Sequence, residues 1–420
     1  MLDDRPMDLR RATVSLAALL LLSAPAARAQ SAPPAKPFDA VTAWASFETL
    51  LRERYGYFDR PGINGNAILS AFAEQARRAP DDKAFIETLQ LVAHNFADPH
   101  FVVGPLDLED WAVIPTASDL FGTFDGTAFR IEEVRADSDA LAKGLKPGMV
   151  VRALDGRSPR ATVETITGRP FATLVPAQID FAFNMALAGT RRRPRTLELV
   201  DGHRRRTVAL AATTDQAKRV QEGPLLSVER QGTLGILRIH NSLGDQALIA
   251  QFSQALAGLA DTTTLLIDLR NTPSGGNTSV ARGILGHFVD HDRPYQVHVV
   301  PYESRVLGPP RRFAEYVAPF GARYGGKVYV AGGRWTGSMG EGLMIGFDAI
   351  GATTVGSDLG DLLGALSNET IDGSAARIDL GTEQLFTVDG LPREAYRPRL
   401  YLPRAERDGS HDPVLAAIGR

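Results

Sequence analysis

One stretch, residues 327–347 (KVYVAGGRWTGSMGEGLMIGF), constrains the fold more than any other part of the chain. Its apolar opening, Val328 to Ala331, predicts a short buried strand, which two glycines then end. The small, apolar run from Glu341 to Phe347 predicts a buried helix immediately after the turn. Ser338 therefore stands where a strand gives way to a helix.

A serine at such a turn has two interpretations. Its hydroxyl stands clear of the backbone, and the free N–H groups of the helix start stabilise a negative oxygen, which favours a nucleophile. Alternatively, the hydroxyl only caps the helix. The stretch is not the nucleophile elbow of α/β-hydrolases, because Thr336 occupies a position where that motif requires glycine. These residues alone leave nucleophile and cap both open.

Composition narrows the functional class. A chain of 420 residues has room for two or three domains. Its net charge of −3 argues against a nucleic-acid partner. The chain has no cysteine, which excludes thiolate catalysis, cysteine-ligated zinc and disulfides.

The first 29 residues predict a signal peptide. Arg10 and Arg11 give a positive region, and the apolar core from Val14 to Leu22 is short for a bilayer span. Residues 27–29 (ARA) form a small-x-small cleavage signal, so we expect cleavage after Ala29 and a periplasmic or secreted protein. No later run reaches membrane length, and residues 30–37 predict a linker.

The rest of the chain divides by pattern into a helical cap (38–105), a region of short strands (106–212), a linker (213–225) and an α/β core (226–420). The cap should contain helices at 38–55, 66–78 and 82–95, the last with Asp81 or Asp82 as N-cap. The core should contain strands at 234–239, 264–269, 328–331 and 352–355, helices at 248–259 and 279–288, and a hairpin of 376–380 with 384–388.

Residues 129–156 resemble a PDZ domain. The resemblance rests on a strand (129–134), a short helix (138–143), a Leu-Lys-Pro-Gly turn ending at Gly148, and a strand closed by Asp155-Gly156. The hairpin of residues 196–211 would complete the domain. A domain of this kind binds an extended peptide as an added strand.

A nucleophilic serine needs a base, which is usually lysine or histidine. No lysine follows Lys327, so the lysine of a dyad cannot lie on the elements after Ser338. Among the eight histidines, His100 stands out because it follows a helix end, lies beside Asp98 and opens an extended segment.

The chain resembles the S41 peptidases, the C-terminal processing and tricorn-core type. Five blocks in order carry the resemblance: Asp98-x-His100, the PDZ-like segment, residues 266–276 (LIDLRNTPSGG), Thr336 to Glu341, and Asp389-Gly390-x-x-x-Glu394 with a closing Asp-Pro-x-Leu at 412–415. The resemblance implies a core of the ClpP/crotonase kind, built of β-β-α units, with the helical cap and an inserted PDZ-like β domain. This is a multidomain α/β fold.

The resemblance also implies site residues. Ser338 becomes the nucleophile, His100 the base and Glu394 the carboxylate behind it, since the missing lysine favours the tricorn-like branch. Glu369 competes for the carboxylate role. The backbone N–H of Met339 and one from Gly275 or Gly276 would form the oxyanion hole, and Glu341 would be structural.

The expected function is an exported serine peptidase that needs no metal or other cofactor and takes peptides or proteins, with recognition of their C-terminus by the PDZ-like domain. Two alternatives stay open: a non-catalytic protein that binds a peptide or hydrophobic ligand on the same fold, and an acyl-CoA enzyme on the related crotonase core.

Overall fold

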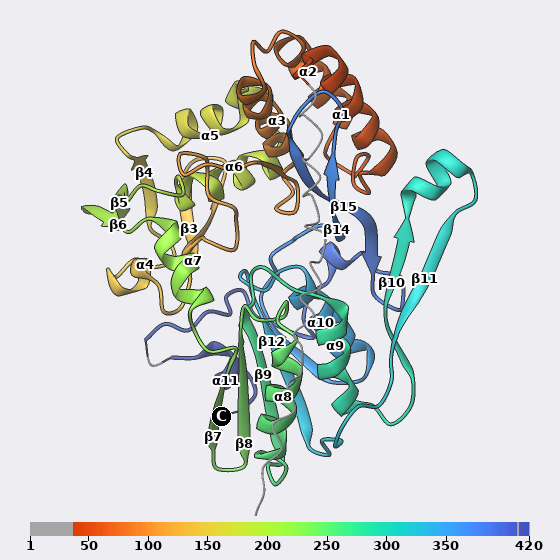
Figure 1. The fold of residues 1–420 in the computed structure, drawn as a ribbon. Helices are drawn as coiled ribbons and strands as arrows, with labels where there is room; N and C mark the ends of the chain where they lie inside the picture. The colour runs from red at the N-terminus through yellow and green to blue at the C-terminus, as the bar shows by residue number, and fades with distance from the viewer. Residues whose placement is uncertain (1–36, 410, 420) are drawn as a thin grey trace, which may run out of the picture. The chain divides into compact units, whose positions relative to one another are not determined.

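A computed structural model describes residues 37–409 and 411–419 (Figure 1). The predicted signal peptide and nearly all of the linker after it lie outside the described residues, so cleavage after Ala29 stays a prediction. Within the described part of the chain, no helix has both the length and the apolar character needed to cross a membrane.

The three helices expected in the cap are confirmed. Each begins at a side chain that accepts a backbone N–H, namely Asp39, Asn64 and Asp81. The helices are α1 (Ala40–Arg54), α2 (Gly65–Arg77) and α3 (Asp82–Phe96).

The C-terminal part of the chain completes the core of the cap. Trp44, Phe47 and Leu51 of α1 share one buried cluster with Ile378 and Leu380 of strand β15 (Arg377–Phe386). After α3 the chain forms β1 (Val102–Gly104), which pairs antiparallel with β15. Burial of these apolar side chains ties the cap to the end of the chain by the hydrophobic effect. Figure 1 shows α1 and α3 beside β14 and β15.

The inserted region forms an antiparallel sheet in the order β2-β3-β4-β5-β6. Its strands are β2 (Leu120–Phe124), β3 (Phe129–Val134), β4 (Val150–Leu154), β5 (Arg195–Asp201) and β6 (Arg204–Leu210), and α4 (Asp139–Ala142) follows β3. The strands and short helix of the PDZ-like pattern are therefore present, while the assignment as a PDZ domain stays a prediction.

The expectation of short strands throughout residues 106–212 is wrong in one respect. Two helices, α5 (Pro159–Thr167) and α6 (Pro176–Ala188), separate β4 from β5. Each has proline at its first turn and glycine at its C-cap, Gly168 and Gly189, which are ordinary signals of helix start and stop.

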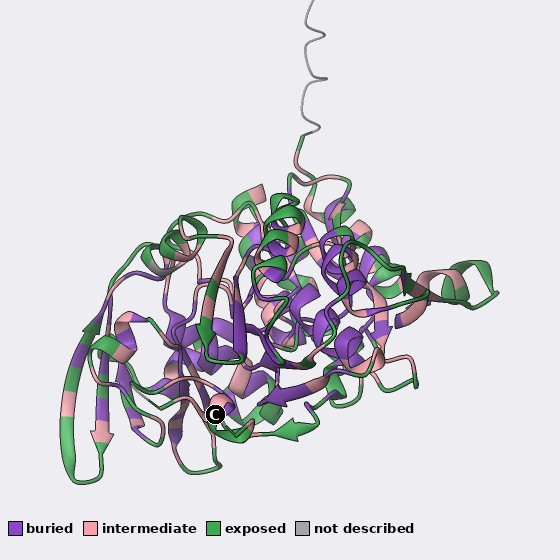
Figure 2. Ribbon diagram, turned by 90° about the horizontal axis from the view of Figure 1, so that it is seen from below, coloured by how far each residue is buried: buried purple, intermediate pink, exposed green. Residues whose placement is uncertain are grey.

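The second sheet carries the site. It has the order β16-β13-β12-β9-β8-β7, and its four middle strands run parallel. The strands are β7 (Leu226–Gln231), β8 (Leu234–His240), β9 (Thr264–Asn271), β12 (Lys327–Gly332), β13 (Thr353–Gly356) and β16 (Leu400–Tyr401). Helices α8 (Ala247–Ala257), α9 (Thr278–Leu285) and α10 (Met339–Ala349) supply the buried apolar side chains against it. Strands β8, β9 and β12 are mostly buried, and Figure 2 shows buried residues gathered in the interior and exposed ones at the hairpin tips.

The third sheet departs from the sequence expectations. Residues 376–388 do not form a hairpin, because β15 continues through Gly381 as one strand. It pairs with β1, with β14 (Ala365–Thr370) and with β10 (Arg293–Val300), which in turn pairs with β11 (Arg311–Val317). A helix, α7 (Thr213–Gln221), also forms within the predicted linker. Its sequence is mostly polar, and nearly all of its described side chains are exposed or half-buried.

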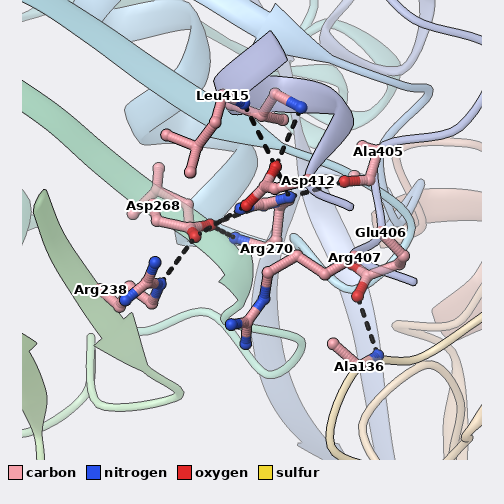
Figure 3. A network of polar contacts seen from close by, with 12 residues as sticks. Ala136, Arg238, Asp268, Arg270, Ala405, Glu406, Arg407, Asp412 and Leu415 are labelled. Carbon is pink, nitrogen blue, oxygen red and sulfur yellow. Dashed lines mark hydrogen bonds and ion pairs between the residues drawn. The ribbon is translucent and has the colours of Figure 1, made fainter. Parts of the chain in front are cut away.

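Two of the sequence blocks behind the S41 resemblance form a buried ionic network (Figure 3). Arg270 lies between Asp268 and Asp412, at 2.8 Å and 2.9 Å from their carboxylates. Although burial raises the pKa of Asp268, the charge and hydrogen bonds of Arg270 outweigh it and lower that pKa to about 2. Asp412 also caps α11 (Pro413–Ala417), so the network fastens the C-terminal helix to β9.

Candidate active site

Ser338 lies at the joint that the sequence predicts, between β12 and α10. Its backbone is in a strained region, with φ 53° and ψ −112°, and the residue is partly exposed. Its own N–H donates to Glu341 Oε2 at 2.6 Å, while its side chain makes no capping hydrogen bond. Glu341 thus holds the start of the helix, which agrees with the structural role expected for that residue.

The glycine loop after β9 packs directly against this serine. Gly275 has φ +65°, and a Cβ built on it would collide with Ser338 Cβ and lie 2.5 Å from Met339 N. Gly276 faces the other way, against the backbone of Leu243 and Gly244. The N–H groups of Met339 and Gly276 have no acceptor among the described residues, whereas Gly275 N donates to Thr272 O at 3.4 Å.

Residues 362–364 connect the serine to the cap. Leu362 N and Ser338 N both donate to Glu341. The buried Arg393 donates to Leu362 O at 2.5 Å, to Gly364 O at 3.1 Å and to Ser338 O at 3.2 Å. One carboxylate and one guanidinium therefore hold the backbone of Ser338 and that of 362–364 together.

His100 meets the same segment from the other side. Its Nδ1 lies 3.0 Å from Leu363 O, so Nδ1 carries the hydrogen and Nε2 is left as an acceptor. The ring is buried, and burial lowers the pKa of His100 to about 4 against the opposing effect of the Leu363 hydrogen bond. His100 is therefore neutral at pH 7. No hydrogen bond joins it to the Ser338 hydroxyl within the described chain.

The two candidate carboxylates have different surroundings. Glu369 lies in strand β14 rather than in a loop, and it is held by Arg54 at 2.9 Å and by the Ser367 hydroxyl at 2.7 Å. Glu394 is exposed in a short 3-10 helix, Arg393–Ala395. Neither makes a hydrogen bond or ion pair to His100 in the part of the chain that the structure describes.

A cavity of about 400 Å³ adjoins the site. Its wall includes Pro99, next to His100, and Gly360, where an added Cβ would meet the backbone of Thr336 and Gly337. Glu394 and Leu363 also line it, and α6 contributes an apolar side through Phe181. Neither Ser338 nor His100 is among the residues that line this cavity; Pro99, the chain neighbour of His100, is.

Sequence reasoning missed two groups in the site and, for a third, the contacts that it makes. The Leu363 carbonyl has no signal in sequence, because every residue has one. Arg393 lies within the last sequence block, but its role follows only from its burial among three carbonyls. Asp98 is recognisable in the sequence as a neighbour of His100, but its contacts with Tyr55 and Leu363 are not.

Comparison with known proteins gives a likeness of structure alone. No protein-family model matches the sequence, and no curated protein matches it. Mature CPAF complexed with lactacystin is 13% identical, with a TM-score of 0.57 over 88% of this chain and 94% of that one. The photosystem II D1 C-terminal processing protease is 14% identical, with a TM-score of 0.53 over 88% and 95%. A putative peptidase from Parabacteroides merdae is 10% identical, with a TM-score of 0.56 over 91% and 96%.

These likenesses confirm the mixed α/β fold class expected from the resemblance to S41 peptidases. At identities of 10–14% they establish the fold and no more.

Proposed function

We propose that this chain is a serine peptidase that hydrolyses peptide bonds through an acyl-enzyme at Ser338, with His100 as general base. The observation that carries the proposal is the anchoring of both residues to one segment. Leu363 O holds the His100 ring, while Glu341 and Arg393 hold the Ser338 backbone to residues 362–364.

The tautomer of His100 suits the first step. With its hydrogen on Nδ1, the ring offers Nε2 to take the proton of the Ser338 hydroxyl as the oxygen attacks a peptide carbonyl. The resulting imidazolium then gives that proton to the leaving amine, and water hydrolyses the ester. The Met339 and Gly276 N–H groups, which lack other acceptors among the described residues, are proposed to bind the oxyanion. Gly275 lets the loop approach the serine closely enough.

The imidazolium needs a negative charge, because burial disfavours it and Arg393 lies nearby. We assign this charge to Glu394, as its motif position implies. Its side chain is exposed on the wall of the adjoining cavity and has no ion pair within the described residues, so it is free to turn toward the ring. Glu369 is already occupied by Arg54.

The substrate is proposed to be a peptide or protein lying in the cavity between the cap, α6 and residues 359–363. The sheet β2–β6 is proposed to act as the PDZ-like module that recognises a C-terminus. The same fold without turnover would be a peptide-binding protein. The observation that favours this second function is that no hydrogen bond joins His100 to Ser338 in the described chain.

Hydrolysis of a peptide mixture, followed by mass spectrometry, tests the proposal. The folded protein should produce new peptide termini, Ser338→Ala should produce none, and His100→Ala should be slowed by about 100-fold or more, as for removal of a general base. Cleavage that survives Ser338→Ala, or no cleavage by the folded wild type while peptides still bind, would replace the peptidase by another activity or by the binding function.

A further inference from the structure

Asp98 is a fully buried carboxylate two residues before His100. Two of its three hydrogen-bond donors are the backbone N–H groups of His100 and of the residue that binds the His100 ring. Oδ1 accepts the backbone N–H of His100 at 2.9 Å and that of Leu363 at 3.3 Å. Oδ2 accepts the hydroxyl of Tyr55 at 2.8 Å. It caps no helix, because α3 ends earlier, with Ala97 as its C-cap.

The contacts of Oδ1 form a closed loop around the imidazole. One oxygen holds the backbone that carries the ring, and it also holds the residue whose carbonyl lies 3.0 Å from Nδ1. A shift of either segment, 98–100 or 362–364, would therefore stretch a hydrogen bond to the same buried atom. The direction in which Nε2 points depends on this atom, although Asp98 does not touch the ring.

Tyr55 fixes the other end of the carboxylate. It is the C-cap residue of α1, has no exposed surface, and packs edge-on against Phe96 with ring centres 5.3 Å apart. The Tyr55 hydroxyl is thus held in place by the packed core of the cap. The carboxylate links α1, the segment before β1 and residues 362–364, three parts that are far apart in sequence.

Stability alone gives a poor account of an acid in this place. Burial raises the pKa of Asp98 to about 6, so the ionised side chain opposes folding near neutral pH. An apolar residue would fill the same space without that cost. What the carboxylate adds is the simultaneous orientation of two backbone N–H groups.

We propose that Asp98, held by Tyr55, is a positioning residue that aims His100 Nε2 and fixes the tautomer through Leu363. The inference rests on the proposed function, because it assumes that His100 acts as a base on Ser338. It assigns no contact with substrate to Asp98 or Tyr55.

Three variants and one control test the inference. Asp98→Ala removes the acceptor, Asp98→Asn keeps a carbonyl oxygen for the two N–H groups, and Tyr55→Phe removes only the hydroxyl. Asn95→Ala is the matched control: Asn95 is equally buried near the end of α3, but it donates to Leu91 O and Thr167 O, away from His100. The readouts are kcat and KM on a short peptide, the rate of fluorophosphonate labelling per folded molecule, and the melting temperature.

Asp98→Ala should lower kcat and the labelling rate by about 100-fold with KM unchanged, since a misplacement of about 1 Å has that effect. Asp98→Asn should recover the rate to within about 10-fold of wild type, and Tyr55→Phe should lose a few-fold. Asn95→Ala should lower the melting temperature while its folded fraction labels at the wild-type rate.

The inference is overturned if Asp98→Ala labels at the wild-type rate. Where the alanine variant does not fold, it is overturned if Tyr55→Phe labels at the wild-type rate. It is also overturned if Asn95→Ala slows labelling as much as Asp98→Ala, because the effect would then be general destabilisation. Suppose that the wild type labels, that Ser338→Ala abolishes the labelling, and that Asp98→Ala labels at the wild-type rate. The peptidase proposal would then stand and this inference would fall. Failure of wild type to label would remove both.

Discussion

Replacing Gly275 by alanine should inactivate the site without unfolding the protein. A Cβ at this position would lie 2.5 Å from Met339 N, whereas ordinary contact begins at 3.4 Å, so the loop or the serine must move by the difference, about 0.9 Å. A displacement of about 1 Å at the reacting groups lowers rates by about 100-fold. We expect that loss in fluorophosphonate labelling of Ser338.

The left-handed backbone adds a separate cost, which a control isolates. Gly232, in the turn between β7 and β8, has φ +59°, close to that of Gly275, but nothing lies within 4 Å of the place that its Cβ would occupy. Gly232→Ala should therefore lose about 1–2 kcal/mol of unfolding free energy from backbone strain and keep its labelling rate. If Gly275→Ala labels as fast as Gly232→Ala, the close packing of this loop on the serine does not serve catalysis.

Three further predictions concern charge. Because burial lowers the pKa of His100 to about 4, activity should stay level from about pH 8 to about pH 5 and fall only below that; a fall through pH 6–7, the range of an ordinary histidine, would contradict the burial seen here. Arg270→Ala should lower the free energy of unfolding by about 3–5 kcal/mol in urea titrations, since it removes the main partner of the buried Asp268 and leaves only Arg238, at 3.4 Å. Glu394→Gln should slow peptide hydrolysis by about 10-fold and Glu369→Gln hardly at all; the reverse order would exchange their roles.

Local signals predicted much of the fold. The cap helices begin at Asp39, Asn64 and Asp81, whose side chains are recognisable caps, and the buried strand β9 and the turn at Ser338 follow from apolar runs and glycines. Helices α5 and α6 carry similar signals, which the many turn residues of that region obscure.

The predictions that failed concern features that depend on contacts between distant segments. Gly381 has the character of a hairpin turn, but β15 runs through it. A Cβ at this position would collide with the Leu363 carbonyl, and the Gly381 carbonyl accepts the Gly56 N–H. The same kind of contact places Leu363 O on His100 and Asp98 on Leu363. A backbone group of this kind has no residue type to mark it, so sequence suggested Glu394 as the partner of the imidazole and could not suggest Leu363.

The pairing of Ser338 with His100 is the central claim, and one measurement tests it most directly. The folded protein is incubated with a fluorophosphonate near pH 7, its intact mass is recorded, and the modified peptide is sequenced. The account predicts one adduct, on Ser338, which is absent from Ser338→Ala and forms about 100-fold more slowly in His100→Ala. No adduct on the folded wild type, an adduct on another residue, or an unchanged rate in His100→Ala would contradict it.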